Sequence, residues 1–189
     1  MDTGFAQSFA VDTAVGLLSG TSCDRPADVP ADRVARIAAQ ARIGINEVTG
    51  LATDFLNQFN EVSMLLDMVA DDPSLIEDLE AWRARDYAQH FAASGFADRH
   101  LVLEAYALAP PLTRRRFDAL CEELSDLLAQ GLAFLVNCHA IGADAALPPA
   151  AAALGGEVRY HLDRLDALIH AGRRRPLQSQ VDPMFAVRR

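Results

Sequence analysis

The chain has 189 residues, of which 51% are hydrophobic, and this size and composition are typical of one soluble domain with its own core. Its net charge of −9 at pH 7 argues against general binding to nucleic acid or to an anionic membrane surface, because both are negatively charged. We therefore expect no nucleic-acid partner and no membrane association.

The longest regular signal is an apolar stripe that runs from residue 31 to residue 69 in alternating steps of three and four. This spacing is typical of one face of a helix, whereas a strand would alternate every second residue. We predict one long helix, or two collinear helices, over residues 31–70; a single helix of this length would extend roughly 58 Å. The stripe consists of Ala31, Val34, Ala38, Ala41, Ile45, Val48, Ala52, Phe55, Phe59, Val62, Leu66 and Val69.

Further helices are predicted on both sides of this stretch from the same kind of spacing. One of them is long, about 113–142, and should pack antiparallel to the first long helix. The expected fold is an all-α antiparallel bundle of about five to six helices, with residues 1–172 as a single domain. The other predicted helices cover residues 4–18, 73–94, 97–108 and about 154–171.

Residues 173–189 differ in charge from the rest of the chain. Their sequence, RRRPLQSQVDPMFAVRR, contains five arginines and one aspartate, so it carries +4 while the remainder carries −13. Two prolines and the lack of a helical period predict an extended basic tail. We expect this tail to contact the acidic body or an acidic partner. The candidate interaction residues are Arg173, Arg174, Arg175, Arg188 and Arg189.

Residues 31–70 also carry apolar side chains beside the main stripe, including Leu51 and Leu65. A single antiparallel neighbour does not need so wide an apolar face. Two helices of the same monomer would cover it, and so would one helix together with a second subunit. Leu51 and Leu65 are therefore further candidate interaction residues, and we expect a protein partner, with a homodimer as one form of it.

The histidines are candidates for a metal or ligand site, because imidazole is the commonest metal ligand in proteins. His161 lies on the apolar stripe of the last helix, and His139 extends the stripe of the second long helix, so both should point inward. Antiparallel packing would bring them near each other, with Glu157 one turn away. Alternatively, both are core histidines hydrogen-bonded to their neighbours. Two other histidines follow a carboxylate by four residues, as surface pairs do: Asp86 with His90, and Asp166 with His170.

Compartment and source are indicated by the first residues and by the choice of basic residues. Asp2 and Asp12 stand where a secretory signal would carry positive charge, and no apolar run approaches the ~20 residues of a membrane span. Three cysteines without C-x-x-C spacing indicate neither a disulfide framework nor a standard zinc module. All 17 basic residues are arginine, as in GC-rich bacterial genomes. We expect a cytoplasmic bacterial protein.

No motif in the chain indicates catalysis. Ser94, Asp98 and His100 are the residue types of a hydrolase triad, but no strand-turn-helix elbow surrounds them. No residue pattern identifies a cofactor. We therefore predict a non-catalytic helical-bundle protein that acts through protein–protein contacts, as a regulator, adaptor or accessory subunit. The alternative is a metal- or small-ligand-binding bundle, an enzyme included, with its site near His139 and His161.

Overall fold

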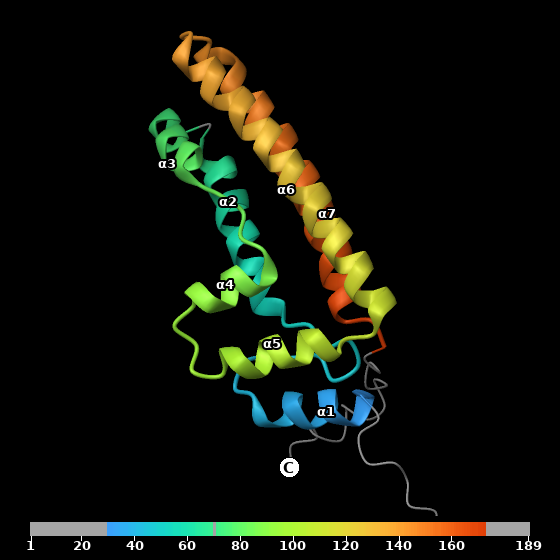
Figure 1. The fold of residues 1–189 in the computed structure, drawn as a ribbon. Helices are drawn as coiled ribbons and strands as arrows, with labels where there is room; N and C mark the ends of the chain where they lie inside the picture. The colour runs from blue at the N-terminus through green and yellow to red at the C-terminus, as the bar shows by residue number, and fades with distance from the viewer. Residues whose placement is uncertain (1–29, 70, 173–189) are drawn as a thin grey trace, which may run out of the picture.

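The computed structural model describes residues 30–69 and 71–172, and within these ranges the chain consists of helices, turns and one isolated β-bridge (Figure 1). The predicted all-α fold is confirmed, while the helix predicted over 4–18 lies outside the described residues. None of the described helices is long and apolar enough to cross a membrane. The helices are α1 (Pro30–Gln40), α2 (Asn57–Met68), α3 (Ile76–Ala81), α4 (Tyr87–Ala93), α5 (Arg99–Leu108), α6 (Pro111–Ala140) and α7 (Leu147–Ile169).

The fold is organised around the antiparallel hairpin of α6 and α7, which lie side by side along their length (Figure 1). The long helix predicted over 113–142 is confirmed as α6, within two residues at each end. A glycine in the middle of α6 allows close packing: a Cβ at Gly131 would lie 2.6 Å from the Leu154 Cδ1 of α7. Glycine costs about 1 kcal/mol of helix stability relative to alanine, and here it makes room for Leu154.

The remaining helices pack against this hairpin in two groups. α2 lies against α7 and α3 lies against α6, so these four helices form the bundle. At the base of the hairpin, α1 packs on α5 and α5 contacts α4 (Figure 1). The pair of α1 and α5 is also joined by an ion pair between Arg33 and Glu104.

The single long helix predicted over residues 31–70 is wrong, and so is the alternative of two collinear helices. α1 ends at Gln40 and α2 begins at Asn57, and between them the chain forms an irregular loop over 41–52 followed by a short 3-10 turn, Thr53–Leu56. In Figure 1, α1 lies across the base whereas α2 runs upward along the hairpin. The α6–α7 hairpin therefore takes the central place that we predicted for this stretch.

A hydrogen-bonded turn explains why residues 41–52 leave the helical path. The Asn46 Oδ1 accepts the N–H groups of Val48, at 2.8 Å, and of Thr49, at 3.0 Å, while the Gly50 N–H donates to the Asn46 carbonyl at 2.8 Å. An asparagine side chain that binds the main chain two or three residues on is typical of a turn. Gly50 has φ +71°, which is strained for any residue with a Cβ.

The loop is partly buried, and hydrogen bonds to distant elements hold it in place. The Thr49 hydroxyl donates to the Ile169 carbonyl at the end of α7, at 2.7 Å, and the Ala52 N–H donates to the Tyr87 hydroxyl at 2.9 Å. Leu51 is 0% exposed. Of the predicted stripe residues in this loop, Ile45 and Ala52 are buried, whereas Val48 is 47% exposed.

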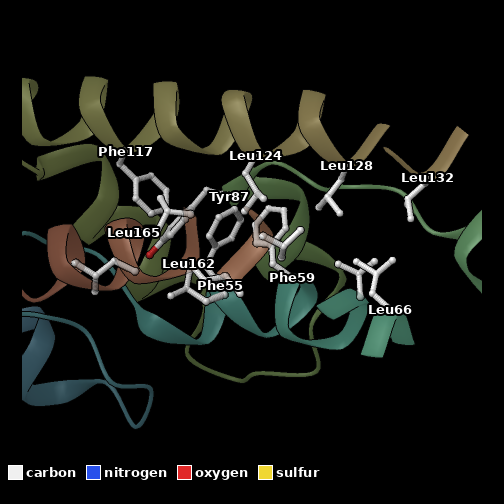
Figure 2. Close-up of a cluster of buried hydrophobic side chains, with 14 of the residues drawn as sticks. Phe55, Phe59, Leu66, Tyr87, Phe117, Leu124, Leu128, Leu132, Leu162 and Leu165 are labelled. Carbon is white, nitrogen blue, oxygen red and sulfur yellow. The ribbon is translucent and has the colours of Figure 1, made fainter. Parts of the chain in front are cut away.

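The hydrophobic core lies between α2 and the hairpin, and Figure 2 shows aromatic and leucine side chains filling this space. Phe55 is at its centre: its ring centroid lies 5.2 Å from that of Tyr87, 5.4 Å from that of Phe117 and 5.7 Å from that of Phe59. These separations are typical of favourable aromatic pairs. The base and the bundle therefore share one continuous core.

The first prediction tests the turn through its glycine. Gly50→Ala should destabilise the protein by about 2 kcal/mol or more, because φ is +71° and the new Cβ would lie 2.6 Å from the Ala105 carbonyl oxygen. Gly44→Ala is the matched control, since no heavy atom lies within 4 Å of the added Cβ. Urea unfolding followed by circular dichroism measures both. Equal unfolding midpoints for the two variants would contradict the positive φ and the close packing at Gly50.

Candidate functional site

The structure does not bring His139 and His161 together. The His139 Nδ1 lies 3.1 Å from the Asp144 Oδ1 at the far end of the hairpin, whereas the His161 Nε2 lies 4.0 Å from the Glu123 Oε2. Glu123 and His139 are 16 residues apart on α6, which is roughly 24 Å along the helix. The Glu157 carbonyl, and not its carboxylate, contacts the His161 ring. In the described parts of the chain, no group of three or more His, Cys, Asp or Glu residues could hold a metal ion.

The two carboxylate–histidine pairs predicted on helix surfaces have different outcomes. The His170 Nε2 lies 3.4 Å from the Asp166 Oδ1, as the spacing predicts. The Asp86 carboxylate instead caps the start of α4, and His90 is partly buried with its ring centroid 5.5 Å from that of Phe55. Burial lowers the pKa of His90 from its ordinary value, because the charged imidazolium loses its hydration.

The candidate interaction residues are also distributed differently from the prediction. Leu51 is fully buried in the loop at the base, so no second subunit can reach it. Leu65 is partly buried and packs against the core. The wide apolar face of this stretch is thus covered largely within the monomer. The five candidate arginines, Arg173, Arg174, Arg175, Arg188 and Arg189, lie outside the described residues.

A groove runs along α6 and is formed by two open clefts of about 580 and 690 Å³. The two clefts share Ala84 and Ser125 in their lining, so they are continuous. On α6 the groove extends from Phe117 to Ala140, which is roughly 35 Å of helix. We call this feature the α6 groove. Sequence periodicity does not reveal it, because its opposite wall is not helical throughout.

That opposite wall is the end of α3 and the linker of residues 82–86, which a buried glutamine holds in place. The Gln58 Nε2 donates to the Arg85 carbonyl at 3.1 Å, and the Arg85 N–H donates to the Gln58 Oε1 at 2.9 Å. Gln58 is only 8% exposed. The sequence did offer a signal for it, because Gln58 lies one turn after Phe55 of the 3-10 turn and one turn before Val62 of α2, and both are buried.

The floor of the first cleft is aromatic. Phe55, Tyr87 and Phe117 of the core reach it, and Tyr106 stacks on Tyr87 with 4.4 Å between ring centroids and 17° between ring planes (Figure 2 shows the first three). The Tyr106 hydroxyl donates to the Asp118 carboxylate, and burial together with this hydrogen bond raises the pKa of Tyr106. Tyr106 is the partly exposed ring of this group, while Phe55, Tyr87 and Phe117 support it from below and are at most 4% exposed.

One wall of the same cleft carries the thiol of Cys121. Burial raises the pKa of Cys121 to about 12, with a smaller contribution from the nearby Asp118 carboxylate. The thiolate is the reactive form of cysteine, so this side chain stays protonated and unreactive near neutral pH. Cys121 thus contributes apolar surface to the cleft.

The walls of the α6 groove are acidic. None of its carboxylates forms an ion pair with an arginine among the residues that the structure describes. Of the two arginines in the lining, Arg83 turns its guanidinium back to the main-chain carbonyls of Glu80 and Trp82. The lining contains five carboxylates and two arginines, for a net charge of −3: Glu80, Asp86, Asp118, Glu122 and Asp126, with Arg83 and Arg85.

Comparison with known proteins does not assign a function to this groove. No family model matches the chain, and neither a curated protein nor a solved structure matches it. The function of the groove is therefore inferred from its own residues.

The second prediction concerns the glutamine that holds the linker. Gln58→Met should destabilise the protein by about 2 kcal/mol, because it leaves the N–H and the carbonyl of Arg85 without their partner. The Arg85 amide should also exchange its hydrogen faster in deuterium exchange. Gln130→Met, at an exposed position of α6, is the control and should change neither measurement. Unchanged protection of Arg85 in the Gln58 variant would exclude this role.

The third prediction concerns pH. The folded state holds the pKa of His90 below its ordinary value of 6.5, so below that pH the unfolded chain binds a proton more readily than the folded one. His90 therefore costs no stability above the unfolded pKa and reduces stability as the pH falls below it. His90→Asn should lose less stability than wild type between pH 7.5 and pH 5.0, measured by urea midpoints. His100→Asn, exposed on α5, should follow wild type. Identical pH slopes for all three proteins would show that His90 does not contribute to the pH dependence of stability.

Proposed function

We propose that the chain is a non-catalytic cytoplasmic protein, a regulator, adaptor or accessory subunit, that binds a segment of a partner protein in the α6 groove. The observation that supports this function is the shape and lining of the groove. It is open, roughly 35 Å long on α6 and apolar at its floor. Such a length suits about ten residues of an extended segment, or a helix of several turns, better than a compact small molecule.

The charge of the groove favours a partner segment that is basic as well as apolar. Asp118, Glu122 and Asp126 follow one another along α6 at steps of four residues, on the helix that forms one wall. Complementary charge speeds association and selects among partners, while burial of apolar side chains contributes most of the affinity. Arginine suits this site because its planar group both pairs with carboxylates and stacks on aromatic rings.

The fourth prediction tests this function by blocking the groove. Ala133 is exposed in the second cleft, so Ala133→Arg should fill it and repel a basic partner. Affinity capture with the tagged full chain in a lysate of the source organism, quantified by mass spectrometry, should show at least one protein that this variant enriches tenfold less than wild type does. Light scattering on the same samples shows whether a second copy is the partner.

The control for this experiment is Ala152→Arg, which places the same side chain at an exposed alanine of α7 that no described cleft includes. It should retain the wild-type set of captured proteins. Circular dichroism should show that both variants remain folded. If the two variants capture the same proteins in the same amounts, the α6 groove is not the binding surface.

A further inference from the structure

We propose that residues 173–189 of this same chain occupy the α6 groove when no partner is bound, so that a partner must displace them. This inference rests on the proposed function, because it names what regulates the groove.

Charge separates the two segments that flank the described body. The described residues contain 11 arginines and 21 carboxylates, for a net charge of −10. Residues 1–29 carry four aspartates and one arginine, a net −3, whereas residues 173–189 carry +4. The groove itself carries −3. Electrostatics therefore opposes residues 1–29 and attracts residues 173–189.

The side chains of residues 173–189 match the two parts of the groove. Three arginines begin the segment and two end it, where they can pair with carboxylates on the walls. The middle of the segment is apolar, as the floor requires, with Leu177, Val181, Met184, Phe185 and Val187. Phe185 could contact Tyr106, which is the partly exposed member of the stacked pair.

The position of Gly172 allows residues 173–189 to reach the groove. Gly172 lies at the base of the hairpin, where its Cβ, if it had one, would be 2.9 Å from the Val48 Cγ1. α6 begins at the same end of the antiparallel hairpin (Figure 1). The first cleft is lined by the earlier residues of α6, so it is the nearer of the two. Seventeen extended residues span up to roughly 56 Å. This exceeds the roughly 35 Å of groove plus the ~10 Å width of the helix that has to be passed.

A tethered segment competes effectively even when its intrinsic affinity is modest. Linkage within one chain gives an effective concentration of the order of mM, which a free partner has to overcome. A partner would therefore need a higher intrinsic affinity to displace residues 173–189. In the absence of a partner these residues would cover the aromatic floor. Loss of the arginines should expose that floor and strengthen partner binding.

The experiment uses Trp82, which is the one tryptophan of the chain and lines the second cleft. In the full chain, quenching of Trp82 fluorescence by neutral acrylamide reports how well the groove is covered. Replacing the five tail arginines with glutamine should raise the quenching constant about twofold or more. Replacing Glu122 and Asp126 with glutamine should raise it similarly, and combining both sets should add little.

A charge exchange distinguishes direct contact from a general effect on folding. Glu122→Arg with Asp126→Arg, combined with glutamate at the five arginine positions, should restore the wild-type quenching constant. The matched control, Glu61→Gln with Asp163→Gln, removes two exposed carboxylates that line no described cleft and should change nothing. If none of the tail or groove variants changes the quenching of Trp82, the inference is overturned.

The capture experiment with Ala133→Arg separates this inference from the proposed function. If residues 173–189 regulate the groove, the variant with glutamine at the five arginine positions should capture several-fold more partner than wild type. Unchanged Trp82 quenching together with capture that Ala133→Arg abolishes would overturn only the role of residues 173–189. Protection of Trp82 that disappears on dilution, with a dimeric mass in light scattering, would show that a second copy supplies the segment and would overturn the contact within one chain.

Discussion

The packing of Tyr87 among Phe55, Tyr106 and Phe117 is the interaction on which the rest of the structure depends. These four rings come from the turn before α2, from α4, from α5 and from α6, so they join the base of the molecule to its bundle. A buried tyrosine also needs a partner for its hydroxyl, and the Ala52 N–H supplies it at the end of the irregular loop. The same rings lie beneath the first cleft of the α6 groove, which is therefore built on the aromatic part of the core.

The sequence predicts which side chains are buried better than it predicts the path of the backbone. Ile45, Leu51 and Phe55 are buried, and the first and last of them continue the three-and-four spacing across the loop. Periodicity indicates which residues face the core. A compact turn that points some of its apolar residues inward can have the same spacing between them as a helix. The feature that distinguishes this loop from a helix is the positive φ of Gly50, which the spacing of apolar residues does not reveal. Where no tight turn intervenes, as in α6, the same reasoning predicts the helix within two residues.

The candidate sites depend on tertiary details that a single helix does not contain. His161 does point toward its neighbour, with a side chain only 14% exposed, so its predicted orientation is largely correct. The two histidines lie at different levels of the antiparallel hairpin, because His139 is next to the last residue of α6 whereas His161 is 14 residues beyond the start of α7. The α6 groove depends on the linker after α3. This linker is held by two hydrogen bonds between the Gln58 side chain and the main chain of Arg85, and not by packing between helices. Hydrophobic periodicity indicates that Gln58 is buried, but it carries no information about the wall that Gln58 holds in place.

Negative charge alone does not make the α6 groove a binding surface, because acidic side chains cover much of the molecule. Asp71, Asp72 and Asp78, for example, are exposed near the start of α3 and line neither cleft of the groove. A basic segment gains little from such a face, since exposed charges are screened by salt and stay hydrated. In the groove the carboxylates stand beside an apolar floor, so a bound segment excludes water from both. Coulombic attraction is stronger in that drier environment, and the hydrophobic contact adds to it. The combination of aromatic floor and acidic wall therefore gives this face the selectivity that net charge lacks.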